Sequence, residues 1–138
     1  MNAFINTPVV LEVGERAVFQ GINSVSRGCW NENGGWLFAP QMTGQFSIVK
    51  AGRYLVQFSA QVTSTAAGVV ELDLNNLGSA ILGTDIAETL TAANDVATVS
   101  AVAEIYVPCN GNAMITVTNS GTIPVTINNA SLVLNRIA

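Results

Sequence analysis

Histidine is absent from the chain, and cysteine is limited to Cys29 and Cys109. Without imidazole, neither a Ser-His-Asp nor a Cys-His relay can form within the chain, and zinc sites with histidine ligands are excluded. Two cysteines do not define a disulfide framework. We expect two reduced, mostly buried thiols, with a disulfide formed after release from a cell as the alternative.

Charge is scarce as well. Charged residues make up 10% of the chain and its net charge is −4, whereas a typical soluble domain has about 25% charged residues. Because so few charges cannot coat one domain of this length, we expect uncharged polar side chains and a subunit interface to replace them. The basic residues are too scattered to neutralise a phosphate backbone, which argues against nucleic-acid binding.

Long apolar runs are also missing. None approaches the roughly 18 residues that span a bilayer, so we expect no membrane partner. The first residues, MNAFINTPVV, lack the positively charged and apolar regions of a secretory signal. We therefore expect a protein that reaches the outside of a cell by assembly and lysis.

The dominant pattern in the chain is alternation of apolar and polar residues. In residues 54–62, Tyr54, Val56 and Phe58 share one face, while Gln57 and Ser59 share the other. Residues 97–107 are apolar on both faces, which predicts that the core covers one face and something else covers the other. Several short strands separated by Gly, Asn and Pro predict a single all-β domain, a sandwich or a barrel.

Two connections between these runs carry specific expectations. Asn110-Gly111 is a strong signal for a type I′ hairpin turn, since both central residues of that turn need positive φ. Residues 84–95 lack a clear period, and we interpret them as a loop with at most one short helix.

The stretch TGQFSIVKAGRYLVQFSAQVT, residues 43–63, resembles the tumour-necrosis-factor and complement-q-like jelly-roll family. The family's pattern is matched by Thr43, Gly44, Phe46, Gly52, Tyr54 and Phe58. The Ala/Val/Thr/Asn-rich, charge-poor character is similar to that of bacterial spore-surface and phage virion members. The resemblance implies a ten-stranded antiparallel jelly-roll sandwich (TNF-like) that forms a homotrimer.

A trimer of this kind hides an apolar outer sheet face, and we expect that interface to include Leu55, Val102, Tyr106 and Met114. Residues 1–8 carry no charge and hold Phe4 and Ile5. We predict that they form an anchoring segment whose two large side chains insert into a neighbouring chain. The jelly-roll domain would then cover residues 9–138.

Residues 29–38, CWNENGGWLF, allow two interpretations. Glycine and asparagine between two tryptophans are typical of a hairpin turn, which would bring the indoles together across the strands. The same pair could stack on a sugar. The weaker ligand candidates are therefore Trp30, Asn31, Glu32, Asn33 and Trp36.

Carboxylates offer little further chemistry. Glu71 and Asp73 lie on one strand face and would both point into solvent, so nothing separates their pKa values for acid–base catalysis. Asp85, Glu88 and Asp95 lack the ligand pattern of a calcium loop. We expect no enzyme, no catalytic residue, no cofactor and no metal.

These observations favour a structural protein, a homotrimeric jelly roll that decorates a particle. A phage head decoration or fibre protein on the virion surface, with capsid proteins as partners, is the first hypothesis. A carbohydrate- or receptor-binding tip is one alternative, and a spore-surface protein is the second.

Overall fold

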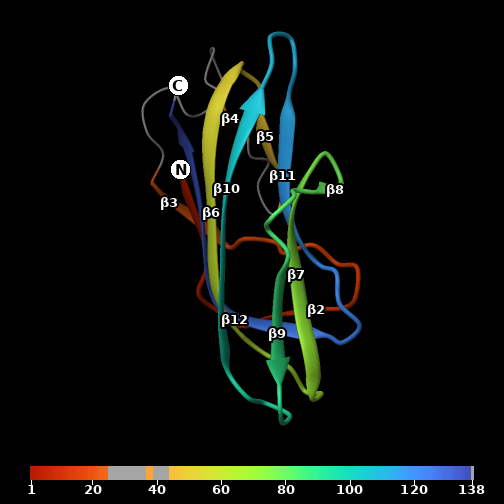
Figure 1. The fold of residues 1–138 in the computed structure, drawn as a ribbon. Coiled ribbons are helices and arrows are strands. Elements are labelled where there is room, and N and C mark those ends of the chain that lie inside the picture. Colours follow the sequence, from red (N-terminus) through yellow and green to blue (C-terminus); the bar gives the residue numbers. More distant parts are fainter. Residues whose placement is uncertain (25–36, 39–43, 138) are drawn as a thin grey trace.

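The computed structural model describes residues 1–24, 37–38 and 44–137, and these form two antiparallel sheets packed face to face (Figure 1). Sheet A has the order β10 (Ala97–Val107), β6 (Gly52–Thr63), β12 (Val125–Arg136), β1 (Asn2–Ile5), β3 (Gly21–Ser24), and β2 (Val9–Leu11) also pairs with β12. Sheet B has the order β4 (Leu37–Phe38), β5 (Phe46–Ile48), β11 (Ala113–Asn119), β7 (Gly68–Asn76), β8 (Ser79–Ala80), and β9 (Ile86–Leu90) also pairs with β7.

The chain passes repeatedly between the two sheets. β6 belongs to sheet A and β7 to sheet B, and the chain crosses again from β9 to β10, from β10 to β11 and from β11 to β12. Such crossings are typical of a jelly roll. Within the described ranges there are twelve strand segments rather than the expected ten, because β4 and β8 are ladders of two residues. The expected all-β jelly-roll sandwich is confirmed.

Alternation along the strands builds the core. On β6, Tyr54, Val56 and Phe58 are buried while Gln57 and Ser59 are exposed, which confirms the expected orientation of this strand. The same pattern on β12 buries Leu132 and Leu134. Strands of sheet B contribute residues from the other side, so the two inner faces form one core.

A buried asparagine fixes one end of sheet B. The side-chain amide of Asn119 donates to the carbonyl oxygens of Leu11 (3.1 Å) and Ile123 (2.9 Å), and its oxygen accepts from the Gly121 N–H (3.0 Å). Asn119 is 1% exposed. These bonds satisfy the polar side chain and connect the end of β11 to the end of β2.

The N-terminal residues belong to the fold. β1 pairs with β12 on one side and with β3 on the other, and the Met1 nitrogen donates to the Leu134 carbonyl (2.9 Å). Ile5 is 1% exposed in the chain's own core. The prediction of a separate anchor over residues 1–8 is therefore corrected, because residues 2–5 complete sheet A and the Ile5 side chain is not available to a neighbouring chain.

Two connections differ from the expectations. Asn110 has φ of 60° and the Gly111 N–H donates to the Pro108 carbonyl (2.9 Å), so Cys109 and Asn110 occupy the turn centre and Asn110-Gly111 is not a type I′ pair. Residues 86–90, expected within a loop, form β9 because they pair with β7 from Gly68 to Leu72. Cys109 is a free, exposed cysteine and not a buried one.

Candidate assembly face on sheet A

The outer face of sheet A is built from the side chains that alternate with the core residues. β10, β6, β12 and β1 supply outward residues that the register places in rows across the sheet. We call this surface the outer face; its residues are Arg53, Leu55, Gln57, Ser59, Gln61, Thr98, Ser100, Val102, Glu104, Tyr106, Asn129, Ser131, Val133, Asn135, Asn2 and Phe4. Three of the longest strands in the described chain thus expose one broad sheet surface.

The middle and one end of the outer face carry exposed apolar and aromatic side chains among polar ones. Val102 is 59% exposed and Tyr106 is 69% exposed. Gln57 lies between Val102 on β10 and Val133 on β12 in one row. Both side chains lie on β10, the first strand in the order of sheet A, and large exposed apolar side chains on a sheet surface are typical of an interaction site.

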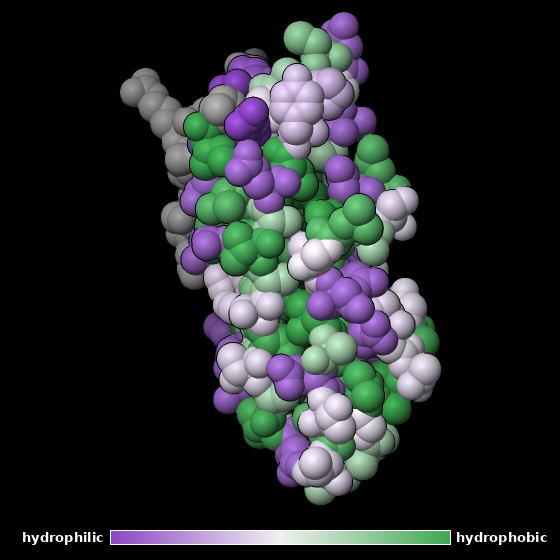
Figure 2. All heavy atoms as spheres, in the orientation of Figure 1, coloured by the Kyte–Doolittle hydropathy of each residue, from purple (hydrophilic) through white to green (hydrophobic). Residues whose placement is uncertain are grey.

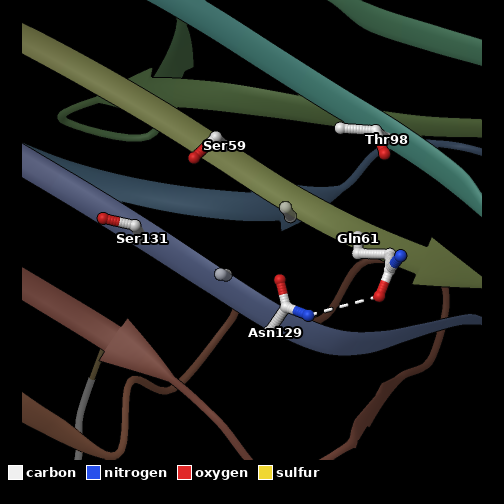
Figure 3. A pocket seen from close by; sticks show the side chains of 7 residues that line it. Ser59, Gln61, Thr98, Asn129 and Ser131 are labelled. Carbon is white, nitrogen blue, oxygen red and sulfur yellow. Dashed lines mark hydrogen bonds between the residues drawn. The ribbon is translucent and has the colours of Figure 1, made fainter.

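The opposite end of the outer face is polar but uncharged. A hollow of about 320 Å³ is lined by Ser59, Ala60, Gln61, Thr98, Asn129, Ala130 and Ser131. Figure 3 shows the labelled side chains along neighbouring strands, with the Asn129 amide donating to the Gln61 side-chain oxygen (3.2 Å). The Ser131 hydroxyl donates to the Asn2 side-chain oxygen (3.0 Å). Small hydroxyl and amide groups at this end leave room for hydrogen-bonding groups of another molecule.

Four of the predicted interface residues lie on this face. Leu55, Val102 and Tyr106 point outward from β6 and β10, and Phe4 points outward from β1 with its ring against Gly21. The prediction is corrected for Met114, which lies on β11 in sheet B, where its N–H donates to the Asn76 side-chain oxygen (3.1 Å).

A second cluster, of carboxylates, lies on the outside of sheet B. The hydrogen bond to Asp85 raises the pKa of Glu71, and burial, followed by the hydrogen bond to Asp85, raises the pKa of Asp73. Asp85 directly precedes β9, which pairs with β7 and brings the three carboxyl groups together. Sequence reasoning groups Asp85 with Glu88 and Asp95 instead, because no local pattern indicates the pairing of β7 with β9.

Asp95 has a local structural role. Its carboxylate accepts hydrogen bonds from the Thr91 hydroxyl (3.0 Å) and the Ala92 N–H (3.1 Å), which closes the turn before β10. Among the described residues, no group of three or more acidic, cysteine or histidine side chains is arranged to hold a metal ion. The predicted ligand residues Trp30, Asn31, Glu32, Asn33 and Trp36 lie outside the described residues.

Within the described ranges, no helix is both long and apolar enough to cross a membrane.

Figure 2 shows that the side of the molecule seen in Figure 1 mixes apolar and polar side chains. The fold and the outer face together define the chain as a two-sheet jelly roll with a charge-poor, partly apolar sheet surface.

No protein-family model matches the chain, and no curated protein matches it. Among solved structures, it is similar to the globular domain of the zebrafish complement 1qA protein, with a TM-score of 0.64 and 13% identity over 99% of this chain and 97% of that one. It is also similar to the Eiger TNF from S. frugiperda, with a TM-score of 0.67 and 11% identity over 100% of this chain and 92% of that one. At these identities the likeness confirms the TNF- and complement-q-like jelly-roll fold.

Proposed function

We propose that this chain is a non-enzymatic assembly module that forms a homotrimer through the outer face of sheet A. The observation that carries the proposal is the exposure of Val102 and Tyr106 on a sheet surface that holds very little charge. Burying them against copies of the chain removes apolar area from water, and the polar side chains around them can exchange hydrogen bonds to water for hydrogen bonds across the interface.

The fold supports the same proposal. The resemblance to the tumour-necrosis-factor and complement-q-like family implies three-fold assembly, and a three-fold ring closes a heterologous interface without leaving an open end. A low charge content is tolerable when a large part of the surface is covered by other copies.

Sedimentation velocity at micromolar concentration tests the trimer, with an expected mass of three times 14.4 kDa. Val102→Asp should shift the protein toward single chains, because it places a carboxylate in the covered surface. The matched control is Val13→Asp, at a valine that is also about half exposed but lies in the turn after β2. A wild-type protein that remains a single chain throughout the micromolar range would contradict the proposal.

We also propose that the trimer acts on the surface of a particle, a phage head or fibre in the first instance and a spore coat in the second. Its support is the charge-poor composition, which suits a protein packed among other subunits. Mass spectrometry of purified particles from the source organism should find the chain in a fixed ratio to the main coat protein. Recovery only in the particle-free fraction would exclude this location while leaving the trimer untouched.

A further inference from the structure

The charged side chains of the outer face form one pair. Among the described residues of this face, only Arg53 and Glu104 are charged. They lie on the neighbouring strands β6 and β10, with the Arg53 Nη1 3.8 Å from the Glu104 Oε1. At the end of the same sheet, the Arg136 guanidinium donates to the Ala51 carbonyl (3.0 Å). Arg53 and Glu104 belong to the same chain, so the pair forms without a second copy.

In a free chain this pair contributes little to folding. The side chains of Arg53 and Glu104 are 64% and 53% exposed, so water solvates both charges and screens their attraction. The situation changes once another copy covers the face, because each charge then loses water and needs an opposite charge nearby. An intact pair presents no net charge to the covering copy, whereas a broken pair presents one.

The surroundings of the pair fit such a cover. A hollow of about 420 Å³ is lined by Arg53, Glu104, Ile105 and Tyr106. The most exposed aromatic side chain of the face, Tyr106, lies directly across from Arg53 in the register of β10 and β6. The pair is thus continuous with the apolar part of the outer face and adjoins a space into which side chains of a second copy can pack.

We propose that the Arg53–Glu104 pair determines whether the outer face can bind a second copy of this chain. The two side chains act by neutralising each other, so loss of either one leaves an uncompensated charge in every interface. Loss of both restores a neutral face. The inference rests on the proposed assembly through the outer face and specifies which residues control it.

Sedimentation velocity over a concentration series tests this proposal with Arg53→Gln, Glu104→Gln and the double variant. Each single variant should raise the concentration for half-assembly about tenfold or more, since one charge is buried without its partner. The double variant should return to within about threefold of wild type. Arg16→Gln and Glu88→Gln, which change exposed charges outside the outer face, are matched controls and should assemble as wild type. Circular dichroism establishes that every variant is folded.

The outcomes separate this inference from the proposed function. Single variants that assemble at the wild-type concentration overturn the role of the pair, and so does a double variant as defective as the single ones. A charge swap, Arg53→Glu with Glu104→Arg, should assemble like wild type because the pair is restored in reverse. If wild-type protein itself never assembles, the proposed trimer fails, and the role of the pair fails with it.

Discussion

Leu77 adopts a backbone conformation that costs free energy. It has φ of 54° and is followed by Gly78 with φ of 83°, in the two-residue turn that joins β7 to β8. Positive φ at both central positions defines a type I′ turn, and Asn-Gly is its preferred pair. A leucine there costs roughly 1 kcal/mol relative to residues that tolerate this region.

Leu77→Asn should therefore stabilise the fold by about 0.5–1 kcal/mol, measured by urea unfolding. The leucine is 55% exposed, so little apolar burial is lost. Leu82→Asn makes the same chemical change at a leucine that is 96% exposed and has no positive φ, and its effect should stay within about 0.5 kcal/mol. A gain of equal size at both positions would mean that the backbone of Leu77 is not the cause.

At the scale of elements, β1 is held on both edges. Hydrogen bonds run to β12 and β3, and Ala3 and Ile5 point into the core. A strand paired on both sides has little freedom to detach and attach to another body. This placement makes the N-terminal residues part of the stability of the domain.

Ile5→Ala should lower the free energy of unfolding by about 2–5 kcal/mol, because it opens a cavity at a site that is 1% exposed. Thr7→Ala, two residues further along and exposed, should change it by less than about 0.5 kcal/mol. Equal, small effects in urea unfolding would show that β1 is only loosely docked.

The stability of the fold depends on pH through the carboxyl groups of Glu71 and Asp73 on β7 and of Asp85, which lies between β8 and β9. Glu71 and Asp73 have pKa values above their ordinary 4.5 and 3.8 in the folded chain, so the folded state holds protons that the unfolded state releases. Stability from this cluster is therefore fully present below the ordinary pKa values and is lost as the pH rises through the raised ones.

Asp85→Asn should remove much of the stability loss that accompanies rising pH, because it takes away the carboxyl group that raises the pKa of Glu71. Thermal unfolding of both proteins between about pH 4 and pH 7 should show a stability gain of the variant over wild type that grows with pH. Glu88→Gln on β9 serves as the control, and the difference in stability between this variant and wild type should be the same at every pH. A gain that is the same across this pH range would indicate that the carboxyl groups do not interact.

At the scale of the whole molecule, assembly through the outer face couples folding to concentration. The outer face of sheet A holds Val102 and Tyr106, which stay exposed in one chain and would be covered by a copy. Whatever binds the folded state alone stabilises it by mass action. The melting temperature of the wild type should therefore rise by about 5 °C over a roughly hundredfold increase in concentration.

The Arg53→Gln variant is the control for this prediction, because it should assemble less well than wild type. Its melting temperature should depend less steeply on concentration in the same range. A wild-type melting temperature that is independent of concentration would place all of the stability in the single chain and contradict assembly in that range.

Local alternation in the sequence by itself determined most of the architecture. Period-two spacing in residues 54–62 identified β6 and its buried face, because a half-buried strand must alternate. The same reasoning placed Val102 and Tyr106 on the second face of β10. Composition predicted a surface poor in charge, because the number of charged side chains available to the surface depends only on which residues are present.

Tertiary pairing decided what local pattern could not. Residues 86–90 have a burial pattern with three exposed residues between Ile86 and Leu90, so they show no strand alternation, yet they pair with β7. Met1 to Ile5 form a segment too short to show a period in the sequence. Their docking depends on pairing with β12, at the other end of the chain. The meeting of Asp85 with Glu71, and of Arg53 with Glu104, likewise follows from register between strands, which a single sequence does not encode locally.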